Sequence, residues 1–121
     1  MPQALTYDEA VAAARLAYDE DRLLAQHPFE KDGKLVYGYR VIDPTGRECR
    51  CAIGASLTEE TLAEIDWRIL HDKTIGYLIG DTLEVPEANI RLLDDLQSSH
   101  DEWLRGDDSA KELFLHLIGR G

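Results

Sequence analysis

Residues 34–53 read KLVYGYRVIDPTGRECRCAI, and this stretch decides the fold class. Leu, Tyr, Tyr and Val occupy every second position from 35 to 41, and Cys, Cys and Ile do so from 49 to 53, a period typical of strands. Between the two runs, Asp43-Pro44-Thr45-Gly46 is a turn sequence, because proline fixes φ and glycine accepts positive φ. The stretch therefore predicts a β-hairpin.

A helix is predicted before the hairpin. Thr6-Tyr7-Asp8-Glu9 has the form of a capping box, in which Thr6 and Glu9 satisfy free backbone N–H groups. Apolar side chains follow on one face at spacings of four and three, with alanines beside them that allow a close neighbour. We expect His27-Pro28 to end this helix, because proline disfavours helical geometry in the residue before it.

Three further helices are predicted after the hairpin. Thr58 is a candidate N-cap for the first, and Pro86 suits the start of a long helix that runs to about residue 105. Gly106 ends the long helix, and Asp107 or Asp108 caps the last one. Residues 74–80 fit either a third strand or a helical turn. About four helices packed on a hairpin or small antiparallel sheet give an α+β fold, in a single domain spanning 1–121.

Charge is the unusual global property of the chain. Its 121 residues carry 24 acidic and 13 basic side chains, a net charge of −11. Such a field repels nucleic acid and anionic membranes and attracts basic surfaces, so we expect neither direct nucleic-acid binding nor membrane binding. No basic stretch followed by an apolar one marks a secretion signal at the N-terminus, and a cytoplasmic location is expected.

Cys49 and Cys51 are two positions apart on a predicted strand, which directs both sulfur atoms to the same face. One interpretation is half of a zinc site, since zinc favours thiolate and imidazole ligands. The other ligands would then come from the four histidines, His27, His71, His100 and His116. The alternative is packing in the core, where free cysteine is common. No second cysteine pair exists, so packing is favoured, and neither a metal nor a cofactor is predicted.

The dipeptide His-Asp occurs twice, at His71-Asp72 and His100-Asp101. Metal-dependent phosphohydrolases built as helical bundles use such a pair together with further His and Asp ligands. The predicted hairpin departs from that architecture, and His100 falls on the apolar face of its helix. A partly buried histidine with hydrogen-bond partners is the favoured interpretation of His100.

Two other catalytic patterns are incomplete. Gly54-Ala55-Ser56 lacks the second glycine of a nucleophile elbow, so we expect Ser56 or Thr58 to cap the next helix. No glycine loop is followed by Lys and Ser or Thr, which argues against a phosphate-binding loop. No catalytic residue is therefore predicted.

Acidic side chains form two clusters away from the predicted helix starts. They are Asp19, Glu20 and Asp21 near the end of the first helix, and Asp94, Asp95, Asp101 and Glu102 on the long helix. Carboxylates at the C-terminal end of a helix oppose its dipole, so the first cluster is expected to cost stability. Acidic residues retained at a position where they destabilise the helix indicate a function at the protein surface. The alternative is that these charges only keep the surface solvated.

The segment Cys51-Ala52-Ile53-Gly54-Ala55 and the later stretch LDDLQSSHDEW, residues 93–103, together resemble a pattern in small uncharacterised bacterial and phage proteins. The resemblance covers about half of the chain and implies a bacterial or mobile-element origin. Compact acidic proteins from that setting include inhibitors that imitate nucleic acid, such as anti-restriction and anti-CRISPR proteins. It brings no activity with it.

The leading hypothesis is a non-enzymatic interaction protein, an inhibitor or regulator whose acidic face docks on a basic, nucleic-acid-binding partner. The seven clustered acids named above are the predicted contact residues. A second hypothesis is a small metal- or thiol-dependent enzyme that uses Cys49, Cys51 and a histidine. A third is a structural homodimer anchored by Trp67 and Trp103.

Overall fold

The structure is a computed structural model that describes residues 2–68 and 82–121, apart from the side chains of 65–68. This part of the chain contains four α-helices and three two-stranded sheets, which confirms the predicted α+β class. The helices are α1 (Tyr7–Asp19), α2 (Glu59–Arg68), α3 (Glu87–Leu104) and α4 (Asp108–Leu117). The strands are β1 (Gln3–Ala4), β2 (Glu30–Lys31), β3 (Lys34–Leu35), β4 (Arg40–Ile42), β5 (Glu48–Arg50) and β6 (Leu83–Glu84).

Short 3-10 turns η1 (Leu24–Gln26) and η2 (Gly54–Ser56) complete the described elements. The ambiguous stretch 74–80 lies outside the described residues. Among the helices that are described, none has the length and apolar character needed to cross a membrane.

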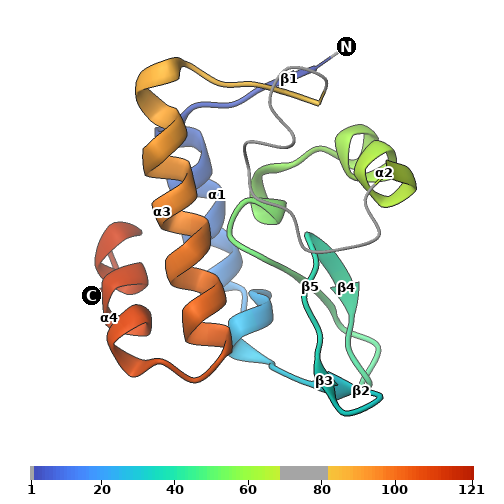
Figure 1. Cartoon of the computed structure of the whole chain (residues 1–121). Helices are drawn as coiled ribbons and strands as arrows, with labels where there is room; N and C mark the ends of the chain where they lie inside the picture. The colour runs from blue at the N-terminus through green and yellow to red at the C-terminus, as the bar shows by residue number, and fades with distance from the viewer. Residues whose placement is uncertain (1, 69–81) are drawn as a thin grey trace.

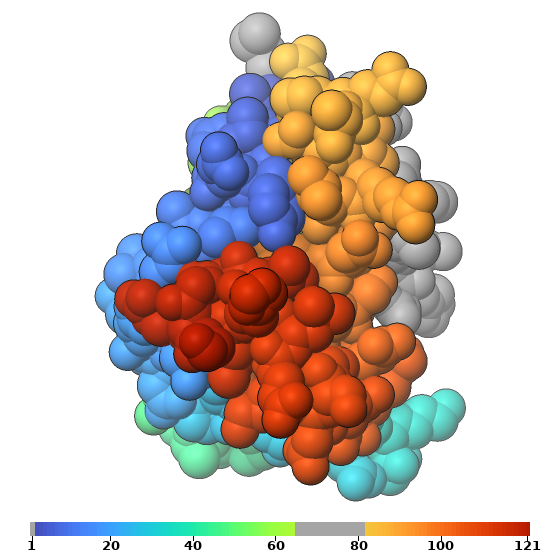
Figure 2. Space-filling view, turned by 90° about the vertical axis from the view of Figure 1, so that its left-hand side faces the viewer, coloured from blue at the N-terminus to red at the C-terminus, as the bar shows by residue number. Residues whose placement is uncertain are grey.

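The long helix α3 lies beside α1 and packs against α4 (Figure 1). Strands β1 and β6 pair in parallel, and each leads directly into one of the helices α1 and α3. The Tyr7 backbone N–H donates to Asn89 Oδ1 at 2.7 Å, which ties the two helix starts together. Figure 2 shows the face of the molecule formed by α1, α3 and α4. The hairpin and α2 lie on the opposite side in Figure 1.

The core consists of two clusters of buried side chains. The larger joins α1, α3 and α4 through residues such as Ala14, Leu96 and Phe114. The smaller joins η1, β5 and the end of α3 through Leu24, Ala25, Cys49 and Leu104. Trp103 is partly buried and packs against both clusters, so the helices and the hairpin share one continuous interior.

Local signals set the starts of the helices as expected. Both hydrogen bonds of the capping box are present, since the Thr6 side chain accepts the Glu9 N–H and the Glu9 side chain accepts the Thr6 N–H. Thr58 Oγ1 accepts the Thr61 N–H at 3.2 Å. Asp107 Oδ1 accepts the Ala110 N–H at 3.0 Å and caps α4. Gly106 ends α3 with φ of 100°, as predicted. These contacts involve residues three apart in sequence, which explains why short motifs reveal them.

The predicted end of α1 at His27-Pro28 is wrong, because α1 ends at Asp19. Asp21 adopts a left-handed φ of 60°, and the N–H groups of Asp21 and Arg22 bond to the carbonyls of Tyr18 and Ala17. This is a Schellman ending with aspartate in the position that glycine usually occupies. The chain then forms a parallel bridge between Leu23 and Arg50, a tertiary contact that no local motif announces.

The hairpin is confirmed, but its strands are shorter than predicted. β4 and β5 are antiparallel, with Arg40 opposite Arg50, Val41 opposite Cys49 and Ile42 opposite Glu48. The earlier part of the predicted strand, Lys34–Leu35, pairs instead with Glu30–Lys31. Asp32 and Gly33 form the turn with φ of 55° and 77°. An Asp-Gly dipeptide is a strong hairpin signal, so this second hairpin was readable from the sequence.

Gly54 allows the chain after β5 to pass directly beneath Tyr39. A Cβ atom at position 54 would fall against the Tyr39 carbonyl oxygen and carbon, which are backbone atoms and cannot rotate away. A Cβ at Gly38 would meet the Val41 Cγ1 methyl at 2.7 Å, while the nearest backbone atom, the Arg40 carbonyl oxygen, would be at an ordinary contact distance of 3.8 Å. The glycine in the CAIGA segment therefore has a packing role.

We expect Gly54→Ala to destabilise the protein by about 3 kcal/mol or more, since the backbone itself must move. Gly38→Ala is the comparison and should cost clearly less than Gly54→Ala, because the Val41 side chain has to shift there and not a backbone carbonyl. Urea unfolding followed by circular dichroism measures both. Equal losses for the two variants would contradict the role assigned to Gly54.

The turn of the hairpin is organised by the buried Asp43 carboxylate. Its Oδ1 accepts the Thr45 hydroxyl at 2.6 Å and the N–H groups of Thr45 and Arg47, each at 2.9 Å. The hydrogen bond from the Thr45 hydroxyl is the main cause that lowers the pKa of Asp43 below its usual value, and the hydrogen bonds from the two N–H groups add to this effect. Folding therefore favours the charged form of Asp43.

This pKa shift predicts a contribution to stability that depends on pH. It is present above the usual aspartate pKa of about 3.9 and is lost as pH falls through the lower folded value. Asp43→Asn should therefore lose less stability than the parent between about pH 5 and pH 2. Thr45→Val, which removes the hydroxyl donor, should reduce the pH dependence in the same direction. Unchanged pH profiles in urea unfolding would refute this assignment.

Candidate functional site

The first acidic cluster lies at the end of α1, where each carboxylate has a cation within the protein. Asp19 receives a bidentate contact from Arg120 at 2.9 and 2.6 Å. Glu20 pairs with Arg22 at 3.1 Å. The hydrogen bonds from Arg120 lower the pKa of Asp19. These pairs offset the unfavourable position of the acids at the helix end, which supplies a structural reason for their presence.

Asp21 links the end of α1 to the hairpin turn. Its carboxylate lies 3.2 Å from Arg47 Nη1 and 3.0 Å from His27 Nε2. Its backbone carbonyl accepts a hydrogen bond from Arg47 at 2.9 Å. The left-handed backbone at Asp21 directs both groups toward the hairpin, so this residue has a role in positioning elements.

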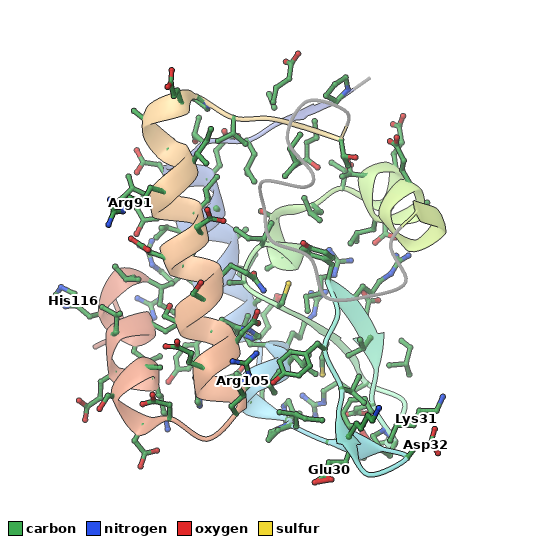
Figure 3. The ribbon with its side chains drawn as sticks, in the orientation of Figure 1. Glu30, Lys31, Asp32, Arg91, Arg105 and His116 are labelled. Carbon is green, nitrogen blue, oxygen red and sulfur yellow. The ribbon has the colours of Figure 1, made fainter. Side chains whose placement is uncertain are left out.

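The second acidic cluster lies along α3 and divides into two sides. Asp94 and Asp101 are seven residues apart, two helical turns, and both are half-buried. Asp95 and Glu102 have the same spacing and are exposed. Within the described part of the chain, neither Asp95 nor Glu102 has an ion pair. Arg91 is exposed one turn before Asp95 and points away from the helices (Figure 3).

Exposed carboxylates continue past the end of α3. The Asp107 N–H bonds to the Glu102 carbonyl at 3.0 Å, so the start of α4 adjoins the end of α3. Asp108 and Glu112 of α4 are exposed there. We call Asp95, Glu102, Asp108 and Glu112 the α3–α4 acidic face.

His100 is fully buried and uses both nitrogens of its ring. Nε2 accepts the Ala25 N–H at 3.2 Å, and Nδ1 lies 3.1 Å from Asp101 Oδ1. The proton therefore belongs on Nδ1, where it is donated to the carboxylate. Gln97 Nε2 donates to the same oxygen at 3.0 Å. His100 thus fits the predicted buried histidine, and neither nitrogen is available to a metal.

The two cysteines are buried, free and packed. Cys49 belongs to the smaller core cluster, and burial raises the pKa of its thiol. Cys51 Sγ accepts the Gly54 N–H at 3.3 Å, and burial raises the pKa of this thiol to about 12. A thiol that stays protonated at neutral pH is a poor nucleophile and a poor metal ligand. The geometry is that of core packing.

The remaining candidate residues do not come together as a site. His116 is exposed and points outward from α4 (Figure 3), and His27 contacts Asp21. Ser56 Oγ donates to the Ile53 carbonyl at 2.7 Å. In the described residues, no group of three His, Cys, Asp or Glu side chains could hold a metal ion. His71, Asp72 and the Trp67 side chain lie outside the described residues.

An arginine network on the hairpin was not predictable from sequence motifs. Arg40 and Arg50 face each other across β4 and β5 and both contact Glu59, at 2.6 and 2.8 Å. Glu48 holds Arg50 from the other side at 2.9 Å. The hydrogen bonds from Arg50 and the charge of Arg40 lower the pKa of Glu59. The network fixes the start of α2 on the hairpin, and its members are too far apart in sequence to be paired by a motif.

Comparisons of this chain with models of protein families, with curated proteins and with solved structures find no match.

The His100 network generates a stability prediction. His100→Ala removes a buried ring and leaves the Ala25 N–H without an acceptor, so we expect a loss of about 3 kcal/mol or more. The exposed residue His116 is the control, and His116→Ala should stay within about 0.5 kcal/mol of the parent. Guanidinium unfolding measures both values. A loss below about 1 kcal/mol for His100→Ala would show that the network is dispensable.

Proposed function

We propose that the protein is a non-enzymatic interaction protein that docks through acidic side chains on a basic, nucleic-acid-binding partner. The supporting observation is the α3–α4 acidic face, where Asp95 and Glu102 are exposed and without an ion pair in the described structure. Asp19 and Asp21, by contrast, are engaged with cations of the protein itself. The proposal therefore places the main contact on α3 and the start of α4.

In the proposed mechanism, the protein occupies the nucleic-acid-binding surface of its partner. Carboxylates would take the place of phosphates against lysine and arginine side chains of the partner, which would block its access to nucleic acid. Binding of this kind is steered by the net charge of −11 and weakens as salt screens the charges. The resemblance to small bacterial and phage proteins suggests that the protein acts as an inhibitor or regulator in that setting, of the anti-CRISPR or anti-restriction type.

The two alternatives gain less support from the same residues. A thiol-dependent enzyme would need a reactive cysteine, whereas burial raises the pKa of Cys51 to about 12. A homodimer anchored by Trp103 would need this side chain at the surface, whereas Trp103 packs against both core clusters. Docking through the α3–α4 acidic face requires neither a reactive cysteine nor an exposed Trp103.

We expect the double variant Asp95→Lys and Glu102→Lys to lose binding to the basic partner by at least about tenfold, because like charges would then meet. The partner is first captured from bacterial lysate on the immobilised protein across a salt series and identified by mass spectrometry. Its affinity for the parent and the variant is then measured with purified components. Both side chains are exposed, so the free energy of unfolding of the variant should lie within about 0.5 kcal/mol of the parent's value.

The matched control is Glu30→Lys with Glu60→Lys, which changes charge by the same amount at exposed positions of β2 and α2. This control should reduce affinity much less than the α3 variant. Equal effects of both double variants would show that only net charge matters. Unchanged affinity of the α3 variant would refute the assigned face.

A further inference from the structure

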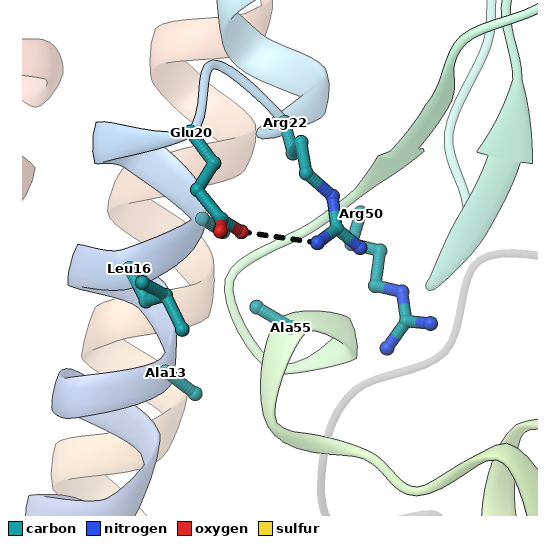
Figure 4. A pocket seen from close by; sticks show the side chains of 7 residues that line it. Ala13, Leu16, Glu20, Arg22, Arg50 and Ala55 are labelled. Carbon is teal, nitrogen blue, oxygen red and sulfur yellow. Dashed lines mark hydrogen bonds and ion pairs between the residues drawn. The ribbon is translucent and has the colours of Figure 1, made fainter.

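A small pocket lies between α1 and η2, beside the first acidic cluster (Figure 4). Its walls are the methyl groups of Ala13 and Ala17 on α1 and of Ala55 on η2. Leu16 forms its rim and is 59% exposed. The cavity volume is about 80 Å³, which suits a short aliphatic chain and is too small for a typical small-molecule substrate.

The Glu20–Arg22 ion pair lies at the mouth of this pocket (Figure 4). The two side chains are 46% and 42% exposed, and an exposed pair of this kind stabilises the protein little. A ligand that brings its own charge can therefore replace one of its members. Glu20 differs in this from Asp19, which is held by two contacts to Arg120, and from Asp21, which contacts both Arg47 and His27.

Arg50 also lines the pocket, but its guanidinium group is already occupied. Its Nε and Nη2 contact Glu48, and Nη2 also contacts Glu59. Its Nη1 donates to the carbonyls of Gly54 and Leu57 at 3.4 and 3.3 Å. The Arg50 side chain is only 11% exposed and its guanidinium points away from the pocket (Figure 4). It supplies a wall and offers little to an anionic ligand.

A shallow apolar pocket with a carboxylate among its lining residues matches the two parts of a lysine or arginine side chain, an aliphatic stem and a charged head. The net charge of −11 favours the approach of a cation to the protein as a whole, and at the pocket itself Arg50 is already paired with Glu48 and Glu59. We propose that the pocket takes an arginine or lysine side chain of the basic partner, with its stem against Leu16 and the alanines and its head on Glu20 in place of Arg22. This inference rests on the proposed function and names a specific contact for it.

The inference is tested on the isolated protein by NMR titration with an acetylated and amidated Gly-Arg-Gly peptide. We expect shifts of the methyl groups of Leu16, Ala13 and Ala55 and weak binding, about millimolar, since a single side chain is bound. Glu20→Gln should weaken binding about fivefold, the value of one partly exposed ion pair. Arg22→Ala should strengthen it about twofold or more, because the internal competitor for Glu20 is removed.

The control variant is Glu102→Gln, which removes the same charge on α3 and should leave the peptide affinity unchanged. The control ligand is the peptide with citrulline in place of arginine, which should not bind. Equal shifts with citrulline, or no effect of Glu20→Gln, would overturn the inference. Binding of isovalerate that is lost in Arg22→Ala would also overturn it, because the pocket would then be an anion site.

Failure of this inference is distinguishable from failure of the proposed function. If the captured partner binds Glu20→Gln as tightly as the parent but loses affinity for the α3 variant, the docking face stands and the pocket does not contribute. If no basic partner is retained at low salt, the docking proposal itself fails, whatever the peptide shows.

Discussion

The buried imidazole of His100 is the contact on which the arrangement of the described elements depends. It reaches from α3 to the Ala25 N–H of η1 and is held on its other nitrogen by Asp101. Its ring also contacts Trp103 and Phe114, with centroid distances of 6.4 and 5.8 Å. This residue therefore joins the helical cluster of the core to the cluster under the hairpin. Because it fixes which side of α3 faces inward, it also fixes Asp95 and Glu102 on the outside.

Much of the fold follows from short-range signals. The Thr6 capping box, the Thr58 and Asp107 caps and the Gly106 ending involve residues near each other in sequence, and a pattern search finds them. The end of α1 was not predictable in this way, since Asp21 is held in a left-handed conformation near Arg47 and the bridge between Leu23 and Arg50. The parallel pair β1–β6 was missed because two-residue strands show no periodicity.

The candidate site likewise combines features that short-range signals predict with tertiary contacts that they do not. The sequence located the acidic clusters but could not reveal that Asp19 meets Arg120, a residue 101 positions away. The two clusters thus look alike in sequence and differ in their electrostatic surroundings. At the end of α1, Asp19 and Asp21 mainly hold the fold together, whereas Asp95 and Glu102 add to the external field. A charge that is unpaired within the protein contributes more to this external field than one that is paired.

The most direct test of nucleic-acid mimicry is a competition titration with the captured partner, labelled DNA or RNA and the purified protein, repeated over a range of salt concentrations. Mimicry predicts that the protein displaces the nucleic acid, that no ternary complex forms, and that the affinities of both ligands fall together as salt rises. A partner that binds the protein and its nucleic acid at the same time, with an affinity for the protein independent of salt, would contradict the proposed function.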